Sequence, residues 1–132
     1  MTERVVLLVD DEKVVLDTLS EQLEEHFAGG LSLETAESVA EGWEVIEALH
    51  GQGVTVVVVV SDWLMPGTKG DEFLAGLHAR FPRIGRILLT GHADPAALER
   101  ARLASDIQVV VAKPWRVDVL CSAIEYSMAG NE

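Results

Sequence analysis

The sequence has little of several features that define whole classes of protein. Its 132 residues include one cysteine, Cys121, so neither an intrachain disulfide nor a thiolate metal cluster is expected. Its apolar runs, such as Val5 to Val9, are much shorter than the roughly 20 residues that cross a bilayer. No glycine-rich phosphate loop follows the first of these runs, which argues against nucleotide binding. We therefore expect a soluble, cytoplasmic protein without membrane insertion.

Basic residues are also scarce, because 10 Lys and Arg stand against 22 Asp and Glu, for a net charge of −12. Most of such a surface would repel a polyanion, so we expect no direct binding to nucleic acid. Hydrophobic residues make up 48% of the chain, which is enough for a buried core. The length fits one domain over residues 1–132, with a core from about 4 to 128.

Short β-branched runs alternate with longer helical patterns, a rhythm typical of βαβ units around a parallel sheet. The expected strands are 5–9, 31–36, 54–60, 86–90 and 109–112, and the expected helices are 13–27, 38–50, 71–81, 94–104 and 117–128. The third strand has six valines in seven residues, as expected for a central strand buried on both faces. Right-handed crossovers then favour an α/β fold with a doubly wound, flavodoxin-like five-stranded sheet in the order 2-1-3-4-5.

Two local signals refine these boundaries. Ser38 and Glu41 have the spacing of a capping box, in which each side chain accepts a hydrogen bond from a free amide at the start of a helix. The stretch from Asp62 to Gly70 predicts a loop between the third strand and the next helix.

Polar side chains follow four of the five expected strands. Asp10 and Asp11 follow the first strand, Asp62 the third, Thr90 the fourth and Lys113 the fifth. Each alone is most simply a turn or cap residue. Because the carboxyl ends of parallel strands meet in one crevice, we expect these side chains to converge there.

Such a crevice would concentrate negative charge. Three carboxylates within about 5 Å repel one another by roughly 3 kcal/mol per pair at an effective dielectric constant near 20, and one lysine cannot neutralise them. A divalent cation with oxygen ligands would neutralise the three carboxylates, and Mg²⁺ is the expected ion. Acidic metal ligands, a nucleophilic carboxylate, a hydroxyl and an ammonium group are the parts that phosphoryl transfer to an aspartate requires.

Four motifs show a resemblance to a known family. They are Val-Asp-Asp-Glu at 9–12, Ser-Asp-Trp-Leu-Met-Pro-Gly at 61–67, Leu-Leu-Thr-Gly at 88–91 and Ala-Lys-Pro-Trp at 112–115. With them the chain resembles the receiver (REC) domains of two-component response regulators from about residue 4 to 128.

The resemblance implies a role for each residue at the strand ends. Asp62 would be the phosphoacceptor, Thr90 the switch hydroxyl and Lys113 the partner of the phosphoryl group, with a cis peptide bond before Pro114. The implied Mg²⁺ ligands are three carboxylates and one backbone carbonyl, namely those of Asp10, Asp11, Asp62 and Leu64.

The implied function is a phosphorylatable signalling switch rather than a turnover enzyme. Its partners would be a sensor histidine kinase or phosphotransfer protein and a downstream effector. One alternative is a receiver-fold module that binds proteins without being phosphorylated. Another is a phosphatase with an aspartate nucleophile, which needs a second acid two residues after the nucleophile, where this chain has Leu64.

Overall fold

The computed structural model describes residues 4–63, 65–91, 96, 99, 103 and 109–129. Five strands in these ranges form one parallel sheet in the order β2-β1-β3-β4-β5, which confirms the predicted topology. The strands are β1 (Arg4–Val9), β2 (Ser32–Ala36), β3 (Thr55–Asp62), β4 (Gly85–Thr90) and β5 (Val109–Ala112).

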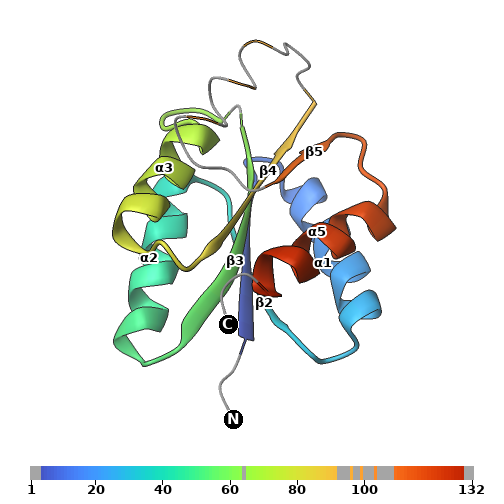
Figure 1. The fold of residues 1–132 in the computed structure, drawn as a ribbon, viewed down its shortest axis with the longest axis horizontal. Coiled ribbons are helices and arrows are strands. Elements are labelled where there is room, and N and C mark those ends of the chain that lie inside the picture. The colour runs from blue at the N-terminus through green and yellow to red at the C-terminus, as the bar shows by residue number, and fades with distance from the viewer. Residues whose placement is uncertain are drawn as a thin grey trace.

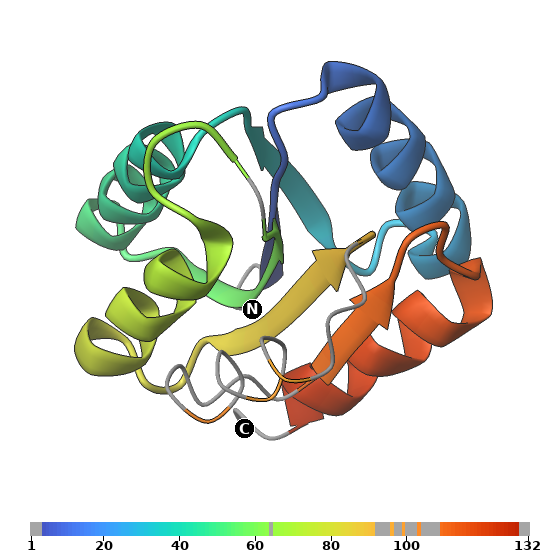
Figure 2. The ribbon, with the colours of Figure 1, turned by 90° about the horizontal axis from the view of Figure 1, so that it is seen from above.

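Helices cover both faces of the sheet. They are α1 (Lys13–Phe27), α2 (Val39–Gly51), α3 (Gly70–Arg80) and α5 (Val117–Ala129). Helices α2 and α3 lie on one face, and α1 and α5 lie on the other (Figures 1 and 2). The helix expected over 94–104 falls outside the described residues, apart from 96, 99 and 103.

Strand β1 shows how the sequence builds both halves of the core. Val5, Leu7 and Val9 pack on the α2 and α3 side, whereas Val6 and Leu8 pack on the α1 and α5 side. All five are at most 2% exposed. Because alternate residues point to opposite faces, an all-apolar strand is stable only when helices cover both faces.

The start of α2 follows the predicted capping box with one difference. The amide of Glu41 donates to Ser38 Oγ at 3.1 Å, as expected. The Glu41 carboxylate accepts a return bond at 3.3 Å from the amide of Glu37 rather than from that of Ser38. The side chain reaches one residue further back and still satisfies an amide before the first turn.

The loop predicted from Asp62 to Gly70 is shorter at both ends. Asp62 is the last residue of β3 and lies opposite Leu89 of β4, because the pairing of these strands continues to that point. Gly70 is the first residue of α3, and its amide donates to the carbonyl of Trp63 at 2.8 Å. The prediction placed these two residues in the loop and was wrong there.

Candidate functional site

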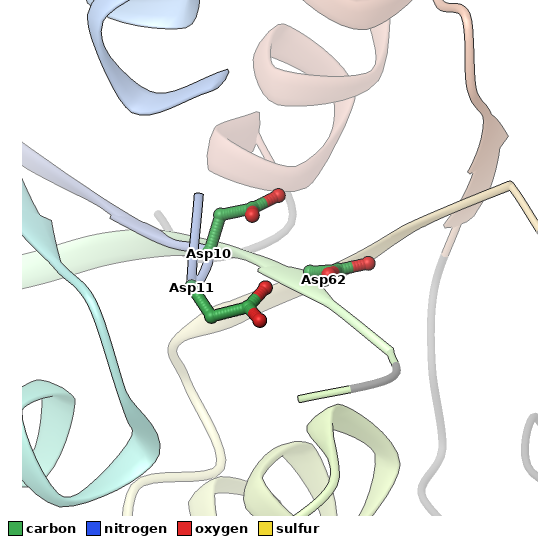
Figure 3. A group of neighbouring side chains, drawn as sticks. All are labelled: Asp10, Asp11 and Asp62. Carbon is green, nitrogen blue, oxygen red and sulfur yellow. The ribbon is translucent and has the colours of Figure 1, made fainter. Parts of the chain in front are cut away.

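Three aspartates converge at the carboxyl ends of β1 and β3. Asp10 and Asp11 follow β1, and Asp62 ends β3. One carboxylate oxygen from each lies within 4.8 Å of the other two, and Figure 3 shows the three carboxyl groups side by side. Asp10 and Asp62 are buried and Asp11 is exposed. The structure therefore brings together the three carboxylates that the strand-end argument singled out.

Asp10 is held on both of its oxygens. It is 1% exposed, its Oδ1 accepts the amide of Glu12 at 2.9 Å, and its Oδ2 accepts Lys113 Nζ at 2.8 Å. Its own amide donates to the carbonyl of Ala36 in β2 at 3.1 Å. A buried carboxylate needs such partners, since unpaired burial of its charge costs several kcal/mol.

Lys113 reaches the cluster from the end of β5. Its Nζ lies 3.3 Å from Asp62 Oδ1, in addition to the 2.8 Å contact with Asp10. Its amide donates to the carbonyl of Thr90, and the bond to Pro114 is cis, as predicted. One ammonium group thus bridges the carboxylates at the carboxyl ends of β1 and β3.

The pKa of Asp62 is subject to opposing effects. Burial, followed by the charge of Asp10, raises the pKa of the Asp62 carboxyl, although Lys113 and the amide of Trp63 act in the opposite direction. For Lys113, burial lowers the pKa, but its hydrogen bond to Asp10 and the charges of both aspartates together raise it. Lys113 therefore stays protonated, while the cluster has more negative charge than one lysine can balance.

Thr90 occupies the end of β4 beside this cluster. It is 3% exposed, lies opposite Ala112 of β5, and follows Leu89, the residue opposite Asp62. This register places its backbone at the same edge of the sheet as the aspartates. Leu64, predicted to offer a backbone carbonyl to the metal, lies outside the described residues.

The segment after Asp62 contains contacts that the sequence reasoning missed. Trp63 Nε1 donates to Asp71 Oδ1 at 3.1 Å, which ties the residue after Asp62 to the first turn of α3. A Cβ at Gly70 would overlap the backbone carbonyl oxygen of Asp62, so only glycine allows α3 to begin this close to β3. Gly70 could have been noticed as a glycine at a helix start, whereas no periodicity links Trp63 to Asp71.

The donor set fits a hard divalent cation. Three carboxylates and one ammonium group leave two negative charges in excess, and all the anionic donors are oxygens. Mg²⁺ prefers carboxylate oxygens and retains several waters, so it needs few protein ligands. The exposure of Asp11 leaves the cluster open to solvent on one side.

Known proteins with similar sequences include transcriptional regulators. The family described as "Response regulator receiver domain" matches residues 6–125. The hydrogenase transcriptional regulatory protein HoxA of Cupriavidus necator is 31% identical over 123 residues, which cover 93% of this chain and 24% of HoxA. The DNA-binding transcriptional regulator NtrC of Escherichia coli is 31% identical over 129 residues, covering 98% of this chain and 26% of NtrC. The chain thus spans about a quarter of the length of these relatives.

Solved structures lead to the same family. The signal receiver domain of an HD domain-containing protein from Pseudomonas fluorescens Pf-5 superposes with a TM-score of 0.86 at 26% identity, covering 98% of this chain and 97% of that one. Within the described ranges, no helix has the length and apolar character that crossing a membrane requires. The match over residues 6–125 and the shared fold show that the chain belongs to the receiver domain family of response regulators.

Proposed function

We propose that Asp62 accepts a phosphoryl group from the phosphohistidine of a sensor histidine kinase or phosphotransfer protein. One observation supports Asp62 above its neighbours. Both oxygens of Asp10 already accept hydrogen bonds, and Lys113 forms no hydrogen bond or ion pair with Asp11. Asp62 accepts Trp63 N–H and Lys113 on Oδ1, and no described residue donates to its Oδ2, which therefore remains available as a nucleophile.

In the proposed reaction Asp62 Oδ2 attacks the phosphorus atom of the phosphohistidine. A new O–P bond forms, the N–P bond breaks, and its electron pair returns to the imidazole of the donor, which takes up a proton. A carboxylate attacks without the help of a general base, because the nucleophilic form has no proton to lose. Lys113, beside Asp62, supplies positive charge for the phosphoryl oxygens.

The remaining residues position charge around the transferred group. Mg²⁺, which supplies positive charge to the phosphoryl oxygens when bound, would be held by Asp10, Asp11, Asp62 and the backbone carbonyl of Leu64. The hydroxyl of Thr90 would donate to a phosphoryl oxygen and so convert phosphorylation into a change of surface. That surface would contact a downstream effector protein or domain.

The domain acts as a switch and not as a turnover enzyme, because the acyl phosphate stays on the protein until water removes it. It acts in the cytoplasm, where the ATP that charges a histidine kinase is found. The relatives HoxA and NtrC are named as transcriptional regulators, so the effector in this proposal is a partner that controls transcription or another output.

Phosphorylation with a small donor tests the assignment directly. Incubation with acetyl phosphate and Mg²⁺ should add one phosphoryl group, measured by intact-mass spectrometry, and chelation of Mg²⁺ should prevent the addition. Asp62→Asn should abolish the label, whereas Asp17→Asn, an exposed change of equal charge on α1, should leave it. A label that persists in Asp62→Asn would show that another residue is the phosphoacceptor.

A further inference from the structure

A cavity of about 390 Å³ lies at the end of the sheet opposite the aspartate cluster. It opens between the C-terminal parts of α2 and α3, the first residues of β3 and the segment that precedes β4. Figure 1 shows both helices running away from the edge of the sheet at which the strands end. Small-molecule sites in proteins usually have volumes of about 300–1,000 Å³, so this cavity can hold a small ligand.

The interior of the cavity is apolar. Its floor is formed by Ile46, Val56 and Ile84, which are at most 5% exposed, and its wall by the half-buried Val54 and Phe81. The ring of Phe81 packs edge-on against a second ring, that of His50, at the rim of the cavity. Such a lining favours a flat apolar group, and aromatic groups pack favourably against other rings in edge-to-face or offset-stacked geometry.

The first of two arginines at the rim is already engaged. Arg80 pairs with Glu47 at 3.1 Å, and its guanidinium lies 4.8 Å from the ring centre of Trp43 and 5.4 Å from that of Phe81. It also belongs to the last turn of α3, where a cation offsets the partial negative charge of the helix end. The charge of Arg80 is thus balanced by the protein itself.

Arg83, the second arginine at the rim, has no such partner. Its side chain forms no hydrogen bond or ion pair with any residue in the described part of the chain, and no acid lines the cavity. The buried Arg86 donates to the carbonyls of Pro82 at 3.2 Å and Ile84 at 2.7 Å, which holds the backbone on either side of Arg83. A fixed segment therefore presents one unpaired guanidinium beside an apolar cavity, on a chain with a net charge of −12.

We propose that this cavity binds a small aromatic carboxylate, with its ring inside and its carboxylate on Arg83. A guanidinium matches a carboxylate in planar, two-point geometry. One unpaired arginine balances one negative charge, whereas a polyphosphate would need several cations and would meet repulsion from the acidic surface. The site lies apart from Asp62 and does not depend on phosphorylation.

Titration with 2-naphthoate, followed by ¹H–¹⁵N NMR of the full chain, tests this proposal. The amide shifts should centre on residues 46–56 and 80–84. Naphthalene-2-carboxamide, a neutral analogue of similar shape, should bind at least about fivefold more weakly, because it cannot form a charge-assisted pair. Arg83→Gln should weaken naphthoate binding by a similar factor and abolish its advantage over the amide.

Two matched variants distinguish a specific contact with Arg83 from a general effect of positive charge on naphthoate binding. Arg83→Lys should retain part of the preference for the carboxylate. Arg116→Gln, which removes an exposed arginine just before α5, should bind like the parent protein. Equal affinity for carboxylate and amide, equal affinity of Arg83→Gln and the parent, or shifts outside the cavity would overturn the proposal.

Discussion

Replacing Asp11 by asparagine should stabilise the protein in the absence of divalent cations and remove most of the stabilisation that Mg²⁺ confers. The side chain of Asp11 is exposed and makes no hydrogen bond or ion pair within the described residues. The substitution keeps its shape and removes one negative charge. The change in the free energy of unfolding therefore reports the electrostatics of the cluster, with little contribution from lost contacts.

The geometry sets the magnitude. At the 4.8 Å that bounds the cluster, two unit charges repel by about 0.9 kcal/mol in bulk water and about 3.5 kcal/mol at an effective dielectric constant of 20. Asp11 faces solvent, so the lower value applies to its interactions with Asp10 and Asp62. Attraction to Lys113 offsets about one of these two repulsions. The expected gain on replacing Asp11 is about 1 kcal/mol.

Urea unfolding with and without Mg²⁺ measures both effects. Without Mg²⁺ the midpoint should rise for Asp11→Asn and stay nearly unchanged for Asp17→Asn, the control on the exposed side of α1. With Mg²⁺ in large excess the parent should gain stability with the logarithm of the ion concentration, and Asp11→Asn should gain much less. Equal responses of Asp11→Asn and Asp17→Asn, or an undiminished gain of Asp11→Asn in Mg²⁺, would refute the reasoning.

Three further predictions concern other parts of the molecule. Lys113→Met should lower the free energy of unfolding by about 3 kcal/mol, measured by urea unfolding, because it leaves the buried charge of Asp10 without its cation. An unchanged urea midpoint would contradict the pairing of Lys113 with Asp10. Gly70→Ala should lower the free energy of unfolding by about 1–3 kcal/mol and slow phosphorylation by acetyl phosphate, because the added Cβ overlaps the carbonyl of Asp62. A phosphorylation rate equal to the parent's would show that α3 adjusts freely. Cys121 is 1% exposed, and burial followed by neighbouring acids raises its thiol pKa, so a disulfide reagent at pH 8 should react at least about 100-fold faster in urea than in buffer. Because the pKa of this thiol is higher in the folded state than in the unfolded state, its ionisation lowers the free energy of unfolding only as the pH rises above the ordinary thiol pKa.

The sheet could be predicted from the sequence because its strands are rich in β-branched, apolar residues. A run of six valines in seven residues can hardly be anything but a central strand, and its neighbours followed from the alternation of strands and helices. The convergence of Asp10, Asp62 and Lys113 was predictable for the same reason, since parallel strands end at one edge.

Contacts that depend on loop geometry could not be predicted from the sequence. The bond between Trp63 and Asp71 spans eight residues, and the loop between them includes Gly67 at a φ of +83°, a conformation that no periodicity encodes. Lys113 was expected to serve the phosphoryl group at Asp62, yet its shorter contact is with Asp10, at 2.8 Å against 3.3 Å. A difference of half an ångström depends on packing throughout the domain.

The pairing of β3 has a consequence for how the domain can carry information. Ser61 lies opposite Val9 of β1 and Asp62 lies opposite Leu89 of β4, so both neighbouring strands hold the backbone next to the side chain that would receive the phosphoryl group. In the proposed function, we therefore expect movement after phosphorylation to arise beyond the strand ends, at one rim of the molecule. The opposite rim, where β3 and β4 begin, lies at the far end of these paired strands, and we expect it to move less. Such a domain would present a phosphorylation-dependent surface at one end of the sheet and a constant surface at the other end.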